Sequence, residues 1–545
     1  MHSYTITNAI DDRNVLRFHI DYFKPDVALK LGGDLHMHAV AKAILEKHDA
    51  ATQERRFNAI LATASINDAI QYYELFHELQ AEQIALNDTY RPLNIACVFS
   101  PPAEGNKDIK QIQEDLPQEK ADNSVEPNKK KEALTKIMAD YNRQYNTNHK
   151  ITEFDAYYQD VQQRIKNQKY ANADYAHEHK IDVMIVVDML LTGFDSKYLN
   201  TLYVDKNLKY HGLVQAFSRT NRILNDTKRH GNILDFRQQE EAVNDAIALF
   251  SGLNKDEARK IWLVDPAPIV MEQYKEAVAN FAHFMDAQGL EAKPSEVDNL
   301  KGDEARGEFI NTFKEIQRLK TQLSQYTDIK EEQADAIEAL IPEEDFRSFR
   351  SVYLDTAKRL RSQQEKQGND APEVVQQLDF EFVLFSSALI DYDYIMGLLA
   401  AYTQNKPSKQ KMTRAQLVNL LSSSANMLDE REDIISFINT LEEGKGLTEA
   451  EIREGYQQYK AEKSAGELNT MAEKHSLEAE SLQAFVDKII DRMVFDGERL
   501  TDLLAPLGLR WKERRLRELA LMEDLIPLLK KRAEGREIAG LDVYE

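Results

Sequence analysis

The chain has 545 residues and a formal net charge of −23, from 69 Lys and Arg against 92 Asp and Glu. At roughly 150 residues per domain, this length predicts three or four domains. The acidity excludes a globally basic coat for nucleic acid but leaves room for a local basic face. The single cysteine, Cys97, excludes an internal disulfide framework and a thiolate zinc cluster.

The chain carries no feature of a secreted or membrane-spanning protein. Its first residues lack the apolar core of a signal peptide. The longest apolar stretch, 380–401, contains Glu381, Asp391 and Asp393, too many charges for a bilayer span. We therefore expect a cytoplasmic protein.

Short apolar runs rich in β-branched residues alternate with helical patterns in the first 265 residues. These runs lie at 57–63, 93–99, 181–187, 201–204 and 232–236. Nearly continuous apolar strands between helices predict a parallel α/β sheet buried on both faces. Residues 101–150 break the pattern with nine acidic and nine basic residues. We expect an inserted, partly flexible segment there, and a solvated helical excursion without function is the simplest form it could take.

The periodicity changes after a DPAP tetrapeptide at 265–268, whose prolines discourage helix in the residues before them. Helical spacing then dominates, and two apolar stripes are interpreted as core-facing. Their members are Leu482, Phe485, Ile489 and Met493, then Leu516, Leu519, Met522, Ile526 and Leu529. The sequence thus predicts an α/β domain over 1–265 and a mostly α-helical domain over 266–545, which carries most of the net negative charge.

The strand predicted at 181–187 leads into a TGFD loop at 192–195. We expect this loop beyond the carboxyl ends of the parallel strands, where ligands bind in such sheets. Gly193 would let the backbone approach a ligand closely. Asp195 could accept hydrogen bonds from ribose hydroxyls.

A second motif, QAFSRTNR at 215–222, places Arg219 and Arg222 one helical turn apart. This spacing predicts both guanidinium groups on one helix face. Together they could bind phosphate oxygens and stabilise the charge that develops during phosphoryl transfer. From Lys197 to Arg237 there are eight Lys and Arg but three Asp and Glu, which favours a bound polyanion. The structural alternative is an arginine pair that bridges acidic neighbours.

The run TGFDSKYLNTLYVDKNLKYHGLVQAFSRTNRI resembles the second motor domain of the restriction (R, or HsdR) subunit of type I restriction-modification enzymes. This subunit belongs to helicase superfamily two, whose general signature is only Gly-x-Asp and QxxGRxxR. The surrounding LNTLYVDKNLKYHGL and SRTNRI are features of the restriction subunit. Ser218 replaces the general glycine, and Asp188 stands where close relatives are expected to have glycine. Residues 57–79 resemble the motif IV region of the same domain.

The resemblance implies a RecA-like motor domain and a role for each motif residue. Gly193 and Asp195 would approach ATP, and Gln215 would couple the ATP site to DNA, although a locally satisfied glutamine is the alternative. Arg219 and Arg222 would be the catalytic pair that reaches the γ-phosphate of ATP across a cleft between two motor domains. The residues implied to lie near the nucleic-acid backbone are Thr192, Asp188 and Val187.

Two motifs of the complete enzyme are not found in the chain. It contains no GxxxxGK(S/T) loop for the β- and γ-phosphates of ATP and no acidic pair after a buried strand for Mg²⁺. The one Pro-Asp pair, Pro25 and Asp26, is not followed by the rest of a PD-(D/E)xK nuclease centre. Asp34, His36 and His38 could suggest a metal site, but they lack a fourth ligand and a strand context. We therefore expect the carboxyl-terminal half of a restriction subunit, inactive alone, with the phosphate- and metal-binding loops for ATP and Mg²⁺ elsewhere.

The implied partners are double-stranded DNA and the methyltransferase subunits, and through these the specificity subunit. The acidic helical region would dock on the methyltransferase. Its most apolar stretch, 378–402, is either core or a docking surface. Two alternatives stay open: a motor domain of another superfamily-two helicase or chromatin remodeller, and a non-catalytic helical interaction protein with a vestigial motor domain.

Overall fold

The computed structural model describes most of the chain. The described residues are 6–24, 30–87, 89–103, 107–166, 179–224, 227–367, 392–404, 414, 417–418, 421, 431–442, 444–492, 495, 497–508, 510–532, 538 and 540–541. The Pro-Asp pair at 25–26, Met493 of the first apolar stripe and residues 378–391 of the most apolar stretch lie outside them. Among the described helices, none is long and apolar enough to cross a membrane.

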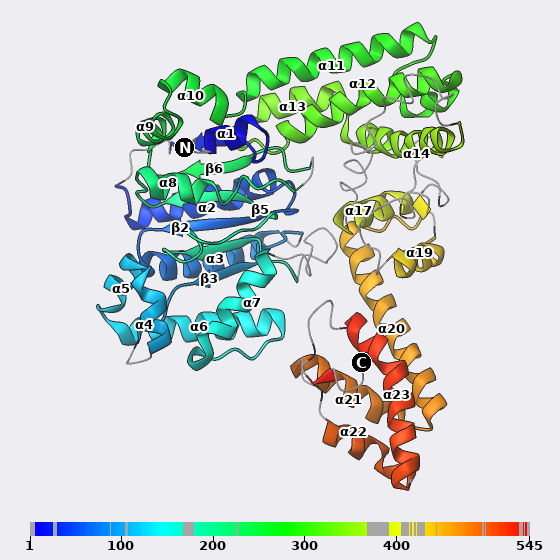
Figure 1. Ribbon diagram of the computed structural model, residues 1–545. Coiled ribbons are helices and arrows are strands. Elements are labelled where there is room, and N and C mark those ends of the chain that lie inside the picture. The colour runs from blue at the N-terminus through cyan, green and yellow to red at the C-terminus, as the bar shows by residue number, and fades with distance from the viewer. Residues whose placement is uncertain are drawn as a thin grey trace.

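The first half of the chain forms one sheet of six parallel strands in the order β1-β6-β5-β2-β4-β3 (Figure 1). The strands are β1 (Phe18–Tyr22), β2 (Asn58–Thr63), β3 (Ile95–Val98), β4 (Val183–Val186), β5 (Leu199–Asp205) and β6 (Gly231–Asp235). All five predicted apolar runs form strands, and the parallel sheet is confirmed. β1 was not predicted, because His19 and Asp21 interrupt its apolar pattern.

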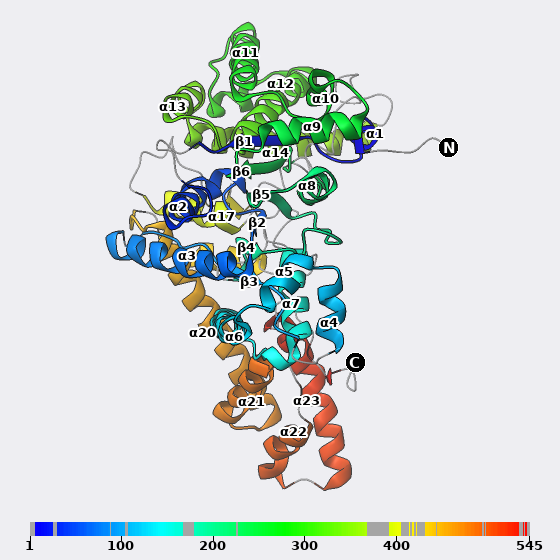
Figure 2. The same cartoon turned by 90° about the vertical axis from the view of Figure 1, so that its left-hand side faces the viewer.

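Helices cover both faces of this sheet. Figure 2 shows α2 (Asp34–Ala51) and α3 (Ile66–Leu86) on one face, with α8 (Tyr210–Phe217) and α7 (Phe154–Lys166) on the other. The remaining helices of this half, apart from the 101–150 segment, are α1 (Ile6–Asp11), α9 (Glu240–Ser251) and α10 (Lys255–Trp262). Burial on both faces explains the continuous apolar strands, since every residue of β2, β4, β5 and β6 is buried.

The charged segment at 101–150 is packed against the sheet rather than solvated. Its helices are α4 (Lys107–Glu114), α5 (Pro117–Asn123) and α6 (Pro127–Tyr145). Along α6 the apolar residues recur on one face and join the hydrophobic core of the sheet; they are Leu134, Ile137, Met138, Tyr141 and Tyr145. The expectation of a solvated excursion is therefore wrong for α6, because its charged residues other than the buried Lys130 lie away from the buried face.

The second half is helical throughout its described residues, apart from connecting loops. Its helices are α11 (Ala267–Ala287), α12 (Gly302–Leu323), α13 (Glu331–Leu340), α14 (Glu343–Gln367), α17 (Tyr392–Thr403), α19 (Arg431–Thr440), α20 (Glu449–His475), α21 (Ala479–Arg492), α22 (Gly497–Leu504) and α23 (Trp511–Arg532). They build two hydrophobic clusters, and α20 contributes to both, with Ile452 and Tyr456 in one and Leu468 and Ala472 in the other. The sequence thus correctly predicted an α/β part followed by a helical part.

The two predicted apolar stripes differ in outcome. Leu482, Phe485 and Ile489 are buried in α21 as predicted. In α23, Leu516 and Leu519 are 70% and 50% exposed, so the prediction that they face a core is wrong. The cluster built by α20 to α23 contains residues of α23 only from Leu521 onward, which leaves the first turns of this helix outside it.

Polar contacts join the helical half to the sheet. The segment that follows α12 lies against β1 and β6, where Asn232 Nδ2 donates to the Gln325 carbonyl at 3.0 Å and Gln325 Nε2 donates to the Thr227 carbonyl at 2.9 Å. The Tyr326 ring stacks on His19 with 4.5 Å between ring centroids. In β1 itself, His19 Nε2 lies 3.2 Å from Asp328 Oδ1 and Asp21 accepts from the Thr327 hydroxyl at 3.0 Å, so the buried polar side chains of this edge strand have partners.

Candidate functional site

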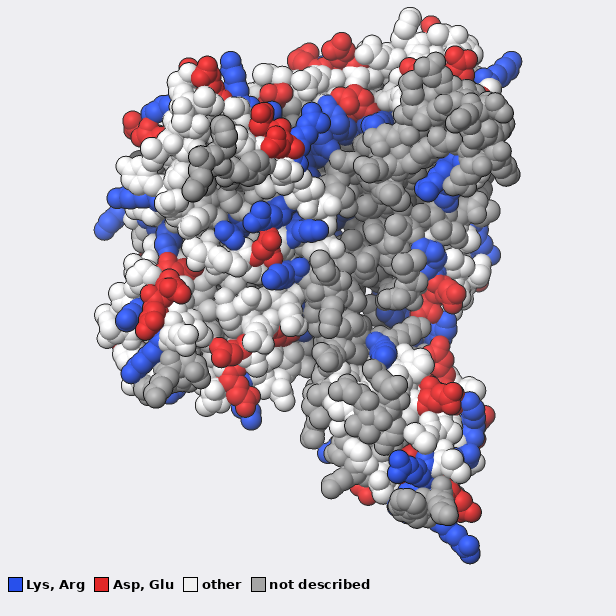
Figure 3. Space-filling model, viewed as in Figure 1, with Lys and Arg blue, Asp and Glu red and all other residues white. Residues whose placement is uncertain are grey.

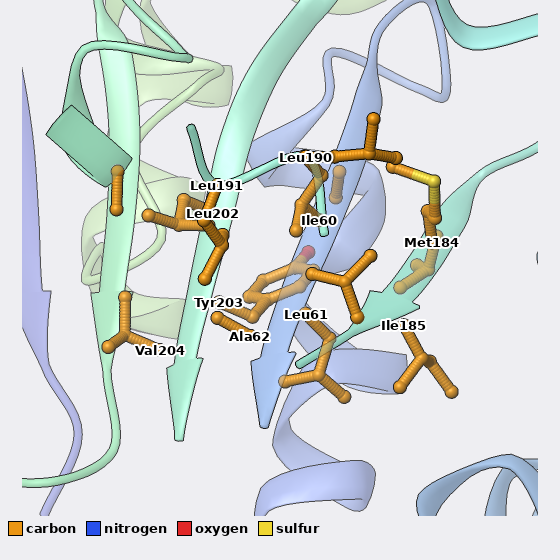
Figure 4. Packing of buried hydrophobic residues seen from close by; sticks show 14 of the residues in the cluster. Ile60, Leu61, Ala62, Met184, Ile185, Leu190, Leu191, Leu202, Tyr203 and Val204 are labelled. Carbon is orange, nitrogen blue, oxygen red and sulfur yellow. The ribbon is translucent and has the colours of Figure 1, made fainter. Parts of the chain in front are cut away.

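The loop between β4 and β5 crosses one face of the sheet. The two strands flank β2 and run parallel, so the chain must return from the carboxyl edge of the sheet to its amino edge. No helix makes this connection over residues 187–198, all of which are described. Leu190 and Leu191 are buried and lie near Ile60 and Leu202 (Figure 4). Apolar side chains thus hold the middle of the loop on the sheet.

The TGFD residues divide into one buried anchor and three exposed positions. Phe194 is buried, whereas Thr192, Gly193 and Asp195 are exposed. Gly193 has φ +72°, and a Cβ there would meet no atom within 4 Å, so glycine serves the backbone conformation rather than close packing. Asp195 stands shortly before β5 begins, at the amino edge. The prediction that it lies beyond the carboxyl ends is wrong, because the loop itself carries the chain back.

The arginine motif begins on α8 but ends beyond it. The helix stops at Phe217, with Ser218 as its C-cap, so Arg219 and Arg222 do not share a helix face as predicted. Both side chains nevertheless reach the 192–195 loop. Arg219 donates from Nε to the Gln215 carbonyl at 3.0 Å and from Nη1 to the Phe194 carbonyl.

Arg222 and Asp195 form an ion pair across the two motifs. The distance from Arg222 Nε to Asp195 Oδ1 is 2.7 Å, and the side chains are 39% and 60% exposed. A pair this open to solvent contributes little to stability. The ion pair instead places two charged groups at the surface, where a ligand can reach them.

The site has an excess of positive charge. Burial lowers the pKa of Arg219, and the neighbouring charge of Arg222 lowers it further, with Asp195 acting in the opposite direction. Two guanidinium groups thus face one carboxylate. On the face seen in Figure 3, Lys and Arg side chains gather over the middle of the α/β half. Such an arrangement favours an anion with several oxygens.

The other predicted site residues lie in different environments. Gln215 is exposed on α8, and its carbonyl accepts from Arg219. The Val187 side chain is fully buried, so it offers no surface to DNA, and its carbonyl accepts from Lys206 Nζ at 2.8 Å. Asp188 pairs with the same Lys206 ammonium. Of the three residues assigned to the nucleic-acid backbone, Thr192 is the one with an exposed side chain.

A buried carboxylate outside the motifs contacts the start of this loop. Glu119 of α5 accepts from the backbone N–H groups of Asp188 and Met189, each at 3.0 Å, and of Ser100 at 2.7 Å. Burial raises the pKa of Glu119, and these hydrogen bonds oppose the rise. Sequence reasoning missed Glu119 because it lies in the charged segment, about seventy residues before the loop.

Asp205 forms a second buried centre at the carboxyl end of β5. Its carboxylate lies 2.8 Å from His36 Nε2 and 2.6 Å from Arg237 Nε, and accepts from the Tyr72 hydroxyl at 2.7 Å. These contacts tie α2, α3 and the end of β6 to β5. His36 is therefore engaged by a carboxylate. Among the described residues, no group of three or more His, Cys, Asp and Glu is arranged to hold a metal ion.

Comparison with known proteins identifies the family. Residues 55–238 match the family model of the type I restriction enzyme subunit R domain 3, and residues 262–532 match that of the type I restriction and modification enzyme subunit R C terminal. The chain belongs to the family of type I restriction enzyme R subunits. The resemblance read from the motifs is thereby confirmed, and both motifs of the site lie inside the first of the two matched regions.

Relatives in this R-subunit family carry endonuclease-subunit names. The chain is 26% identical over 538 residues to the type I restriction enzyme SauCOLORF180P endonuclease subunit of Staphylococcus aureus (strain COL), and 27% identical over 539 residues to the SsaAORF53P endonuclease subunit of Staphylococcus saprophyticus. Each alignment covers 94% of this chain and 53% of the relative. The chain thus spans about half the length of these relatives.

Proposed function

We propose that this chain supplies the second, RecA-like motor domain and the helical assembly region of a type I restriction enzyme that pumps double-stranded DNA by ATP hydrolysis. Residues 1–265 would form the motor domain and residues 266–545 the assembly region. The observation that carries the proposal is the meeting of two motifs, in which Asp195 pairs with Arg222 and Arg219 holds the Phe194 carbonyl. An accessible Arg222 beside a half-buried Arg219, both fixed on a parallel α/β sheet, suits phosphate chemistry.

The donor set fits one side of a nucleoside triphosphate. Arg222 is accessible and Arg219 is half-buried, so a γ-phosphate approaching from a facing domain could accept hydrogen bonds from both. ATP would supply the γ-phosphoryl group, which is transferred to water in hydrolysis. Gly193 and Asp195 would contact the same nucleotide, and the phosphate-binding loop and the Mg²⁺ ligands would come from the facing motor domain.

DNA and the methyltransferase are the proposed macromolecular partners. DNA would pass the exposed Thr192, and Gln215 would couple this surface to the nucleotide. The acidic helical region repels a polyanion, which suits it to a protein partner. We assign it to the methyltransferase subunits, which would hold the motor in place while DNA moves.

The proposal is tested by assembling the enzyme. The chain is mixed with a polypeptide that carries a GxxxxGK(S/T) motor domain of the same family, and with methyltransferase and specificity subunits, and DNA-stimulated ATP hydrolysis is measured. Arg219→Ala and Arg222→Ala should each abolish most of the activity. Arg143→Ala serves as the matched control, because Arg143 is 80% exposed and pairs with Asp140 of the same helix, α6. Full activity of both site variants would mean that the arginines bridge acidic neighbours and take no part in hydrolysis.

A further inference from the structure

The exposed positions of the 187–199 segment are held between two buried side chains, the carboxyl group of Glu119 and the amino group of Lys228. The Glu119 carboxylate lies against the start of the segment and is fully buried. One oxygen, Oε1, accepts from the amides of Asp188 and Met189, and the other, Oε2, accepts from the amide of Ser100. A single side chain thereby ties the carboxyl ends of β4 and β3 together.

Further hydrogen bonds hold helix α5, which carries Glu119, against the neighbouring strand ends. Asn123 Nδ2 donates to the Ser100 carbonyl at 2.8 Å, and the Gln118 amide donates to Asp188 Oδ2 at 3.0 Å. Asp122 accepts from the amide of Ile66 at 2.7 Å, at the start of α3. The inserted helices therefore make contact with the ends of three neighbouring strands, β2, β3 and β4.

Lys228 holds the other end of the segment. Its side chain is about as buried as that of Glu119, with 1% of the residue exposed. Its Nζ donates to the Lys197 carbonyl at 3.0 Å and to the Leu199 carbonyl at 2.7 Å, and burial lowers the pKa of this amino group well below its usual value. It thus fixes the backbone immediately after Asp195, where the chain enters β5.

We propose that Glu119 and Lys228 are positioning residues that fix the two ends of this loop, so that Gly193 and Asp195 are presented to the nucleotide in one geometry with Arg222. The inference rests on the proposed function for its consequence, although not for its geometry. Each of these buried side chains satisfies two or three backbone groups of the strand ends, and ordering an exposed loop requires such contacts to offset its conformational entropy. The inserted segment thereby becomes part of the site.

The chemistry of the two side chains matters as well as their size. A glutamine at 119 keeps the shape but offers one acceptor oxygen and one NH₂ group, so at least one of the three backbone amides would face a donor. A methionine at 228 keeps the length but leaves the carbonyls of Lys197 and Leu199 without their donor. The two variants perturb opposite ends of the loop and act independently of each other.

Amide hydrogen exchange of the full chain tests the geometry. Glu119→Gln and Lys228→Met should each speed exchange within residues 188–199 by about tenfold, while β2 changes less than twofold. Glu114→Gln and Lys42→Met are the exposed controls and should match the parent. Unchanged exchange within 188–199 in either folded variant would overturn the assignment of that residue. A rise spread equally over the sheet would overturn it too, since it would indicate general destabilisation.

A double-variant cycle in the assembled enzyme tests the consequence. Glu119→Gln should lower kcat for ATP hydrolysis by about tenfold and leave KM within about twofold. In the Arg222→Ala background, Glu119→Gln should cause almost no further loss of kcat. Both changes disrupt the same arrangement of the loop and Arg222 around the nucleotide. Multiplicative losses would contradict a positioning role. Full activity of Arg222→Ala itself would refute the proposed function, and the exchange experiment would still decide the geometry.

Discussion

Arg222 is the residue on which the proposed function chiefly depends. In the structure its Nε atom donates to Asp195, and its side chain keeps 39% of its surface exposed. A guanidinium group has further N–H donors after one such bond, so the ion pair does not prevent phosphate binding. Asp195 instead sets the direction in which the remaining donors point.

Asp205 gives a prediction on pH. Burial by itself raises the pKa of this carboxyl, but the hydrogen bond from His36 and the charge of Arg237 outweigh burial, and the pKa is lowered overall. A carboxyl whose pKa is lowered on folding stabilises the fold above its unfolded value of about 4, and this stabilisation is lost as the pH falls through the folded pKa.

Asp205→Asn should therefore destabilise the chain at pH 7 by about 3 kcal/mol, the scale for breaking a buried pair. In this variant the free energy of unfolding should also fall less steeply below about pH 4 than in the parent, because the asparagine amide does not titrate. Urea unfolding between pH 7 and pH 2.5 measures both effects. The exposed Asp256→Asn variant should change neither. An acid limb as steep in Asp205→Asn as in the parent would contradict the assignment.

At the scale of elements, the strands were predictable and their connections were not. The runs at 57–63 and 181–187 form β2 and β4 because strands buried on both faces need continuous apolar sequence. The crossing of the 187–198 loop depends on the strand order, which periodicity does not contain. The end of α8 at Phe217 was likewise missed, since QAFSRTNR continues a helical spacing that the chain does not follow.

Helix α6 gives a second prediction, because its packing shows that the charged segment belongs to the core. Leu134 is fully buried among the residues that cover the sheet. Leu134→Ala should lower the free energy of unfolding by about 2–5 kcal/mol, the usual cost of emptying a well-packed leucine site. Urea denaturation measures it, with the exposed Glu132→Ala as control. A loss below about 0.5 kcal/mol would mean that α6 is a solvated excursion after all.

The whole molecule combines a sheet with a locally basic surface and an acidic helical half. The net charge of −23 therefore describes no single surface, and the basic run from Lys197 to Arg237 lies in the half that contains both motifs. Sequence alone indicated this division and the family. It did not reveal how the halves meet, because residues 325–328 contact β1 and β6 across a long separation in sequence.

Replacing Tyr326 tests how strongly the α/β half and the helical half are coupled in unfolding. Its ring stacks on His19, and its hydroxyl donates to the Asp265 carbonyl at 2.6 Å. Tyr326→Ala should destabilise the chain by about 3 kcal/mol, as for other buried aromatic truncations, and separate the thermal unfolding of the two halves. Differential scanning calorimetry would show this as two resolved transitions. Tyr210→Ala, which removes a 60% exposed ring, should leave the thermogram unchanged. A Tyr326→Ala thermogram identical to that of the parent would contradict the role of Tyr326 in coupling the two halves.

The most direct test of the account is single-turnover ATP hydrolysis by the assembled enzyme with Arg222→Ala. If Arg222 stabilises transition-state charge, its removal should lower the rate of the chemical step by about 10³-fold or more while ATP still binds within a few-fold of the parent affinity. Weaker ATP binding with an unchanged chemical step, or no change in either quantity, would contradict the catalytic role assigned to the meeting of Asp195, Arg219 and Arg222.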